Sequence, residues 1–412
     1  MRATLADEDL GLDALARVCN HAPCMDALLP LEPPHDDVLA GIYRVAFAIE
    51  AREQIEHWWS IAGRDNVRVY TRAGTAVGGL VQVPMGLYAG GRSVSLSGLA
   101  GVAVAPEARG VGVGRAMLSA WLRGLREAGI ATSALYASTR ALYRSVGYEL
   151  AGTHTVGTVH LDALRDVGRR DGAFAPITEA DHAEIAAVYA EHARSQTGRM
   201  DRGSYLWRRV FAHRGKANHG YVLRDPRGVV AWVTLRQTEG TDGFKKVHVE
   251  DHFALDHDAL LRLVGFLSTF GAMAREVSIA GPTAIWDLLP EHRADVRLVE
   301  PWLLRVVDVE RALTSRGYPE GLEARFALSV DDPLFPENGG PWSVEVRDGA
   351  AHVTRVPSAP TSISVRGLAS LFTGYASPSR LRLTGDLRGD TEGDARLGAA
   401  FAGNAPELGD FF

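Results

Sequence analysis

The segment GVAVAPEARGVGVGRAM, residues 101–117, combines features that could bind phosphate. An apolar run is closed by a proline, and glycines then alternate with valines before the chain takes up a helical pattern. Glycines leave backbone N–H groups uncovered, and N–H groups at the start of a helix lie at the positive end of the helix dipole. We therefore expect residues 109–115 to form a phosphate-binding loop.

The spacing of the glycines excludes two common nucleotide-binding motifs. No Gly-Lys-Ser or Gly-Lys-Thr follows, which excludes a Walker loop. A dinucleotide fingerprint is excluded because Arg115 stands where the third glycine would be, counting from Gly110 and Gly112. A glycine-rich turn between a strand and a helix, with no ligand, remains the alternative.

Hydrophobic periodicity indicates the elements that position this loop. Residues up to about 152 are typical of an α/β domain, with a helical stretch from 36 to the mid-60s and then a hairpin. The apolar strand 97–105 should be central and covered on both faces. An amphipathic helix then packs apolar residues between 117 and 125 on the sheet, and a strand, a helix opening at Ser138 or Thr139 and a last strand near Tyr148 follow.

A similar order of elements returns from Pro176 onward, which indicates a diverged second copy of the first domain. The sequence DHDALLRL replaces the glycine loop there, so this copy should not hold phosphates. A third, α+β region begins near Pro301, with a hairpin at Asp348-Gly349 and a helix that carries Leu368, Leu371, Phe372 and Tyr375 on one face. We expect three domains, over residues 1–152, 153–300 and 301–412.

The pattern Arg109-x-x-Gly112-x-Gly114, between a buried strand and a helix, resembles the acetyl-coenzyme A signature of the GNAT N-acetyltransferases. The resemblance implies that the loop amides hold the pyrophosphate and that the strand edge pairs with the pantetheine arm. Ser138 and Thr139 either contact the coenzyme or simply cap their helix. The expected coenzyme-binding residues are Val102, Ala103, Val104, Arg109, Gly110, Val111, Gly112, Val113, Gly114, Arg115, Ser138 and Thr139.

Acetyl transfer to an amine needs a base and benefits from an acid. An amine with a pKa of about 10.4 is neutral in only roughly one molecule in a few thousand at pH 7, and protonation of the leaving thiolate lowers the second barrier. Tyr143 lies within the short helix, whereas Tyr148 begins the last strand and is expected to pack. From the residues alone an ordinary core or surface tyrosine is the better interpretation of Tyr143, but the resemblance implies that it is the proton donor.

The order of the domains narrows the resemblance. An acetyltransferase domain, a second copy without the glycine loop and a third domain like a sterol carrier protein together resemble the Eis (enhanced intracellular survival) family over essentially the whole chain. This implies acetyl-CoA as co-substrate, a homo-hexamer, and the terminal α-carboxylate of Phe412 as proton acceptor. Burial of the Phe412 ring would hold that carboxylate in place. Because a terminal carboxyl has a pKa of about 3.5, desolvation or a relaying water would have to assist it.

The resemblance also implies primary amines as acceptors, either aminoglycoside-like polyamines at more than one position or lysine side chains of peptides. An acidic pocket would suit such cations, and the candidates are Asp36, Asp37, Trp58 and Trp59. A solvated acidic loop and a tryptophan core explain these four residues as well. Two other functions remain open, namely a non-catalytic acyl-CoA sensor or scaffold and lipid binding by the third domain.

The composition of the chain limits the classes of partner and the cellular compartment that we expect. The chain has 412 residues with 50 acidic and 44 basic side chains, and its charge of −6 argues against nucleic acid and favours cationic small partners. Cys19 and Cys24 cannot frame a fold of this size, so a reducing compartment and no metal site are expected. With neither a signal peptide nor a membrane segment in view, we expect a cytoplasmic protein without a membrane partner.

Overall fold

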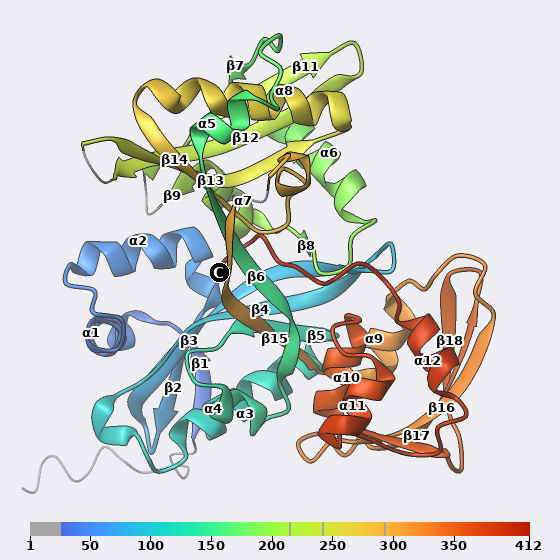
Figure 1. Cartoon of the computed structure of the whole chain (residues 1–412). Coiled ribbons are helices and arrows are strands. Elements are labelled where there is room, and N and C mark those ends of the chain that lie inside the picture. The colour runs from blue at the N-terminus through green and yellow to red at the C-terminus, as the bar shows by residue number, and fades with distance from the viewer. Residues whose placement is uncertain (1–25, 214–215, 241–242, 292–293) are drawn as a thin grey trace, which may run out of the picture.

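The computed structural model describes residues 26–213, 216–240, 243–291 and 294–412. Cys19 and Cys24, on which the expected reducing compartment rests, lie outside these residues. Within the described part, one sheet of 13 strands runs through the first two domains, and the third region has its own sheet of five strands (Figure 1). None of the helices in this part is both long and apolar enough to cross a membrane.

The first domain packs two N-terminal helices and one long helix against its strands. The single helical stretch expected from residue 36 is in fact two helices, because Ala48 adopts a left-handed conformation (φ 52°) that ends the first. The strand expected over 97–105 already begins at Arg92. The elements are β1 Ala27–Pro30, α1 Pro33–Phe47, α2 Arg52–Ala62, β2 Val67–Arg72, β3 Thr75–Ala89, β4 Arg92–Val104, α3 Val113–Glu127, β5 Thr132–Tyr136 and α4 Arg140–Arg144.

The middle of the chain repeats this order. Strands β13 and β14 pair in parallel around helix α8, as β4 and β5 do around α3. Its elements are β6 Glu149–His160, α5 Leu161–Arg165, β7 Ala175–Pro176, α6 His182–Ala193, β8 Met200–Asp201, α7 Ser204–Phe211, β9 Ala212–His213, β10 Lys216–Ala217, β11 His219–Asp225, β12 Gly228–Glu239, β13 Lys245–Ala254, α8 His257–Ser268, β14 Ala274–Ala280 and β15 Asp295–Val306.

Two long strands, β6 and β15, are shared between the two halves of the large sheet. Among the described strands, residues 149–155 of β6 pair with β15 alone, whereas residues 156–160 pair with β14 of the middle domain. At the other end, residues 302–304 of β15 pair with both β5 and β6 in the first domain, and residues 305–306 pair with β5. Each strand therefore begins in one half and ends in the other, and the expected domain boundaries after residues 152 and 300 fall inside β6 and β15.

The third region has its first element at Val309 rather than at Pro301, because residues 301–306 belong to β15. The expected hairpin forms at Asp348 and Gly349, which both have positive φ, and the helix expected to include Tyr375 ends at Phe372. The elements are α9 Val309–Ser315, β16 Ala324–Asp331, β17 Gly340–Arg347, β18 Ala350–Arg355, β19 Thr361–Ser364, α10 Val365–Phe372, α11 Pro378–Thr384, β20 Leu387–Gly389 and α12 Asp394–Ala400.

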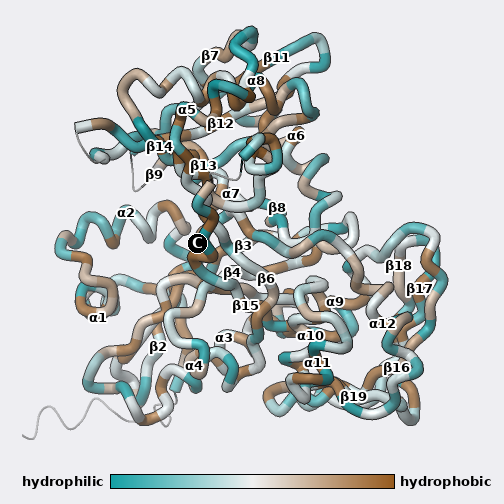
Figure 2. Tube along the Cα trace, viewed as in Figure 1, coloured by the Kyte–Doolittle hydropathy of each residue, from teal (hydrophilic) through white to brown (hydrophobic). Residues whose placement is uncertain are grey.

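The core follows the sheets, and the chain end returns to it. Figure 2 shows hydrophobic residues gathered along strands in the middle of the molecule and hydrophilic residues along the outer loops. Trp232 on β12 and Trp302 on β15 are fully buried. Residues 402–412, here called the C-terminal tail, leave α12 and cross back to the centre, so that the C-terminus lies near β4 and β6 (Figure 1).

Candidate functional site

Strand β4 has one open edge. It pairs in parallel with β5 only from Leu96 to Gly98, while its other edge stays paired with β3 as far as Val104. Within the described strands, the β5-facing edge of residues 99–104 therefore has no partner, and we call it the open edge. The expected Val102, Ala103 and Val104 all lie on it. An extended ligand could pair with these free backbone groups as an additional strand would.

Gly101 forms a bulge in the open edge. Its φ is +57°, and the register with β3 shifts between Gly79 and Val81. A Cβ at Gly101 would lie 2.5 Å from Cη2 of Trp58, so the indole lies directly against this bulge. The Trp58 Nε1 donates to the Tyr205 hydroxyl at 3.1 Å, which fixes the ring. Trp58 is thus placed beside the open edge.

The loop after β4 exposes backbone N–H groups. Gly110 and Gly112 have φ values of +78° and +86°, a conformation that glycine adopts without strain. Among the described residues, the N–H groups of residues 110–115 have no hydrogen-bond acceptor, and Gly112 caps α3 without help from any side chain. A Cβ at Gly110 or Gly112 would meet nothing within 4 Å, so open space lies in front of the loop. This arrangement fits a diphosphate at the N-terminus of the 15-residue helix α3.

The five other loop residues expected to bind coenzyme differ in their surroundings. Arg109 donates from Nε to the Val104 carbonyl at 3.0 Å, which ties the loop to the end of the open edge. Val113 is buried and anchors the start of α3, while Val111 is 63% exposed. Arg115 is exposed on the first turn of the helix, and Gly114 is half-buried beside Leu142.

Ser138 and Thr139 are exposed at the start of α4. Thr139 is the N-cap residue, but its side chain accepts no hydrogen bond from the helix. Simple capping therefore does not account for it in this structure, and contact with the coenzyme stays a prediction for both residues.

Tyr143 combines a buried ring with a free hydroxyl. The residue is 5% exposed, and burial raises the pKa of its phenol to about 12. Its hydroxyl makes no hydrogen bond to the described residues, yet it is not one of their fully enclosed polar atoms. The neighbouring Tyr148 is fully buried and shares a 2.8 Å hydrogen bond with the Ser133 hydroxyl. Tyr148 thus packs as expected, whereas the role of Tyr143 as proton donor stays a prediction.

The C-terminal tail runs along β6 as an added segment of backbone. Thr153 donates to the Pro406 carbonyl at 3.1 Å and accepts from Leu408 N–H at 2.9 Å. The His154 imidazole bonds the Leu408 carbonyl at 2.7 Å, and the Tyr136 hydroxyl donates to the Asp410 carbonyl at 2.7 Å. These bonds hold the last residues of the chain in one place.

Phe412 ends the chain at the point where β4 and β5 separate. The residue is 7% exposed, and a Cβ at Gly98 would lie 2.9 Å from the ring atom Cε2. Gly98 is the last residue of β4 that pairs with β5, through Ala134. Phe411 is half exposed and stacks on Tyr136, with ring centroids 4.7 Å apart.

The acidic candidates for substrate binding are already compensated by arginines. Asp36 forms an ion pair with Arg64, and Asp37 forms one with Arg52. Trp59 is 2% exposed within the core, so among the four candidates only Trp58 is placed at the open edge. A substrate role for these residues stays a prediction.

Sequence reasoning missed four residues of this site. Gly98 and Gly101 could have been found, because a glycine inside an apolar strand often marks a bulge or a close approach. Tyr136 and His154, which bind the tail, carry no local signal of that role.

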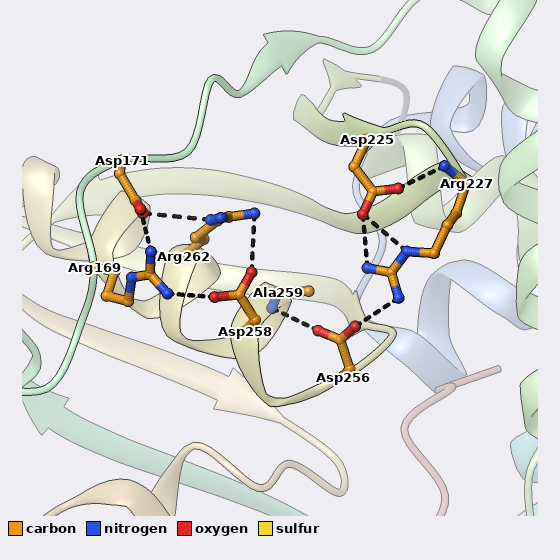
Figure 3. A network of polar contacts seen from close by, with 8 residues as sticks. All are labelled: Arg169, Asp171, Asp225, Arg227, Asp256, Asp258, Ala259 and Arg262. Carbon is orange, nitrogen blue, oxygen red and sulfur yellow. Dashed lines mark hydrogen bonds and ion pairs between the residues drawn. The ribbon is translucent and has the colours of Figure 1, made fainter.

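The middle domain fills the corresponding helix start with carboxylates (Figure 3). Asp256 is the N-cap of α8, and its side chain accepts from the Ala259 N–H at 2.9 Å. Arg227 pairs with Asp256 at 2.8 Å, while Arg169 and Arg262 pair with Asp258 on the first turn. A phosphate at this helix start would meet a carboxylate that already uses the free N–H group, so the helix start is unsuited to phosphate.

Three family descriptions match consecutive parts of the chain. Residues 36–151 match an acetyltransferase (GNAT) domain, residues 198–306 match a second acetyltransferase (GNAT) domain, and residues 309–409 match a sterol carrier protein domain.

Known proteins resemble the chain over nearly its whole length. The N-acetyltransferase Eis of Mycobacterium tuberculosis is 29% identical over 406 residues, which cover 90% of this chain and 96% of the relative. A GCN5-related N-acetyltransferase from Anabaena variabilis superposes with a TM-score of 0.89 at 29% identity, over 94% of this chain and all of the other. Eis1 from Mycobacterium abscessus has the same fold, with a TM-score of 0.73 at 22% identity, over 94% of this chain and 100% of that one.

Proposed function

Because the chain belongs to the Eis family of GNAT N-acetyltransferases, we propose that it transfers an acetyl group from acetyl-CoA to primary amines of small polycations or of lysine side chains. The observation that carries this proposal is the open edge of β4, which leads into a loop of uncapped N–H groups. Aminoglycoside-like polyamines, acetylated at more than one position, are the acceptors we favour among small molecules. The net charge of −6 supports a cationic acceptor.

The residues that would hold acetyl-CoA fall into two groups. The N–H groups of residues 110–115 would bind the diphosphate, and the backbone of residues 99–104 would pair with the pantetheine arm. Bound in this way, acetyl-CoA supplies an acetyl group activated as a thioester. The Trp58 indole, fixed by Tyr205, limits the space above the bulge at Gly101.

Two groups of the chain would move protons. The Tyr143 Oη carries a proton that burial keeps in place at neutral pH, since its pKa is raised to about 12. It is therefore in the protonated form that donation to a leaving thiolate requires. The α-carboxylate of Phe412, whose ring seats it at Gly98, would accept a proton from the ammonium of the acceptor.

The experiment that tests this proposal is release of coenzyme A thiol from acetyl-CoA, with an aminoglycoside and a lysine-containing peptide offered in parallel. We expect thiol release that depends on the amine, with acetylated amine detected by mass spectrometry. Binding of acetyl-CoA without amine-dependent release would instead support the acyl-CoA sensor. Absence of acetyl-CoA binding would refute both functions.

A further inference from the structure

A buried arginine links the C-terminal tail to the middle domain. Arg202 donates two hydrogen bonds to Asp251, from Nη1 at 3.0 Å and from Nη2 at 2.7 Å. Its Nε bonds the Asp410 carboxylate, with oxygens at 2.9 and 3.1 Å. Each of the three residues is only 8% exposed, so both ion pairs are shielded from water.

The surroundings hold the Arg202 guanidinium in a single direction. It lies 4.0 Å from the centroid of the Tyr189 ring and 5.0 Å from that of Trp207. Trp232 donates from Nε1 to Asp251 at 3.0 Å. Burial, the largest single influence, would raise the pKa of Asp251, but the Arg202 charge and the hydrogen bonds from Arg202 and Trp232 together outweigh it and leave this pKa below its usual value. Asp251 therefore stays ionised and orients Arg202 toward the tail.

This cluster lies at the ends of β13 and β14, which correspond in the middle domain to β4 and β5. Asp251 follows Val249, the last residue of β13 that pairs with β14. On the other side, Gly281 directly follows β14, and a Cβ there would lie 2.5 Å from the Cα of Gly409. The tail therefore passes between the separating ends of β13 and β14. The same position in the first domain is the proposed slot for the pantetheine arm.

The first domain fixes the backbone position of Arg202. The preceding strand β8 pairs with β3, through Gly86 with Asp201 and Leu87 with Met200. Immediately after Arg202, a Cβ at Gly203 would lie 2.2 Å from the Pro84 carbonyl oxygen, so the two backbones are in direct contact. Arg202 is thus positioned by β3 of the first domain and by β13 of the middle domain together.

We propose that the middle domain, which is unsuited to phosphate at its own helix start, serves as a clamp for the C-terminus. Asp251 and Arg202 act as positioning residues. Asp251 orients Arg202, and Arg202 binds Asp410. Asp410 in turn positions the carboxylate of Phe412 at the point where β4 and β5 separate. This inference rests on the proposed role of that carboxylate. The inference assigns a function to the middle domain, because the space between the ends of β13 and β14 holds the C-terminal tail.

The test compares Asp410→Asn with Arg224→Gln, both in the full-length chain. Asp410→Asn keeps the side-chain size but removes the charge that Arg202 binds. Arg224→Gln removes an arginine of the same domain that pairs with Asp181 and Glu184 on the exposed surface, away from the tail. For Asp410→Asn we expect kcat to fall by roughly 10²-fold, as for a misplaced reacting group, with the KM for acetyl-CoA unchanged. Arg224→Gln should retain kcat.

A second measurement needs no activity. Carboxypeptidase A should release Phe412 slowly from the wild-type chain and from Arg224→Gln, and at least tenfold faster from Asp410→Asn. Equal release rates in folded proteins, judged by circular dichroism, would overturn the clamp. If Asp410→Asn does not fold, Arg202→Lys takes its place, since it keeps the charge but loses the paired bonds to Asp251, and the same increase in release is expected.

A chain with two residues appended after Phe412 separates the clamp from the function on which it rests. We expect the extended chain to lose turnover and to keep acetyl-CoA binding. Loss of turnover there with wild-type kcat in Asp410→Asn would overturn the clamp alone. Full activity of the extended chain would overturn the role of the carboxylate, and the clamp with it.

Discussion

The Phe412 ring packs directly on Gly98, so the chain ends where β4 stops pairing with β5. A side chain at position 98 would collide with this ring, which gives the glycine a packing reason. The same divergence of strands that opens the edge of β4 therefore also receives the C-terminus. One feature of the sheet thus brings the proposed coenzyme slot and the proposed base together.

Replacement of Tyr143 by Phe should lower kcat by about 10²–10⁴-fold, because the ring keeps its packing while the proton donor is lost. Affinity for acetyl-CoA, measured by calorimetry, should not change. Tyr148→Phe is the matched control, since it removes a buried hydroxyl bonded to Ser133 but no proposed donor. It should cost about 1 kcal/mol of stability and leave turnover intact. Equal activity of Tyr143→Phe and wild type would refute the donor role.

Gly112→Ala should weaken acetyl-CoA binding about tenfold, because alanine at φ +86° costs about 1–2 kcal/mol and shifts the loop away from its binding conformation. Gly124→Ala provides the control. Gly124 lies inside α3, and a Cβ there meets nothing within 4 Å, so alanine should stabilise the helix by about 0.5–1 kcal/mol without affecting binding. If both variants bound the coenzyme like the wild type, the loop would have no part in binding.

Buried tyrosines should make the protein lose stability at alkaline pH. Burial raises the pKa values of Tyr143 and Tyr318 to about 12, against about 10 in an unfolded chain. From pH 10 upward the unfolded state loses protons that the folded state keeps, so the free energy of unfolding falls as pH rises, by on the order of 2 kcal/mol per tyrosine. Phenolate absorbance from these residues should therefore appear together with unfolding. Their titration near pH 10 in the folded protein would contradict this prediction.

The third region should depend on one buried ion pair with the large sheet. Arg305 on β15 is fully buried and bonds both oxygens of Asp332 at 2.8 Å. Asp332→Ala leaves the arginine charge without its partner, which should cost about 3–5 kcal/mol in chemical unfolding. The double replacement Arg305→Met with Asp332→Leu should recover most of this loss. Equal destabilisation by the single and double replacements would show that the lost charge pairing is not the cause.

The fold class followed from the sequence, and the matching family descriptions confirm two GNAT domains followed by a sterol-carrier-like domain. The glycine loop was informative because Gly110 and Gly112 have a backbone conformation that few other residues adopt. The exchange of β6 and β15 could not be predicted, since an apolar pattern shows which residues are buried but not which strand lies next to them.

The contacts that position the C-terminus could not be predicted from local sequence patterns either. Arg202 binds Asp251 and Asp410 across 49 and 208 positions of sequence, and charged residues so far apart give no spacing that could be recognised. Chain ends usually fray, so only the family resemblance pointed to Phe412 as part of a site. The ion pairs of Asp36 with Arg64 and of Asp37 with Arg52 could not be predicted either, because the partners lie far apart in the sequence.

Hydrogen exchange of the backbone amides tests the central claim, that residues 110–115 bind the diphosphate of acetyl-CoA while the open edge pairs with its pantetheine arm. Acetyl-CoA should slow exchange in peptides that cover both the open edge and the loop. Acetyl-pantetheine, which lacks the diphosphate, should at saturation slow exchange only over residues 99–104. Equal protection of the loop by both compounds, or no protection by acetyl-CoA, would contradict the account.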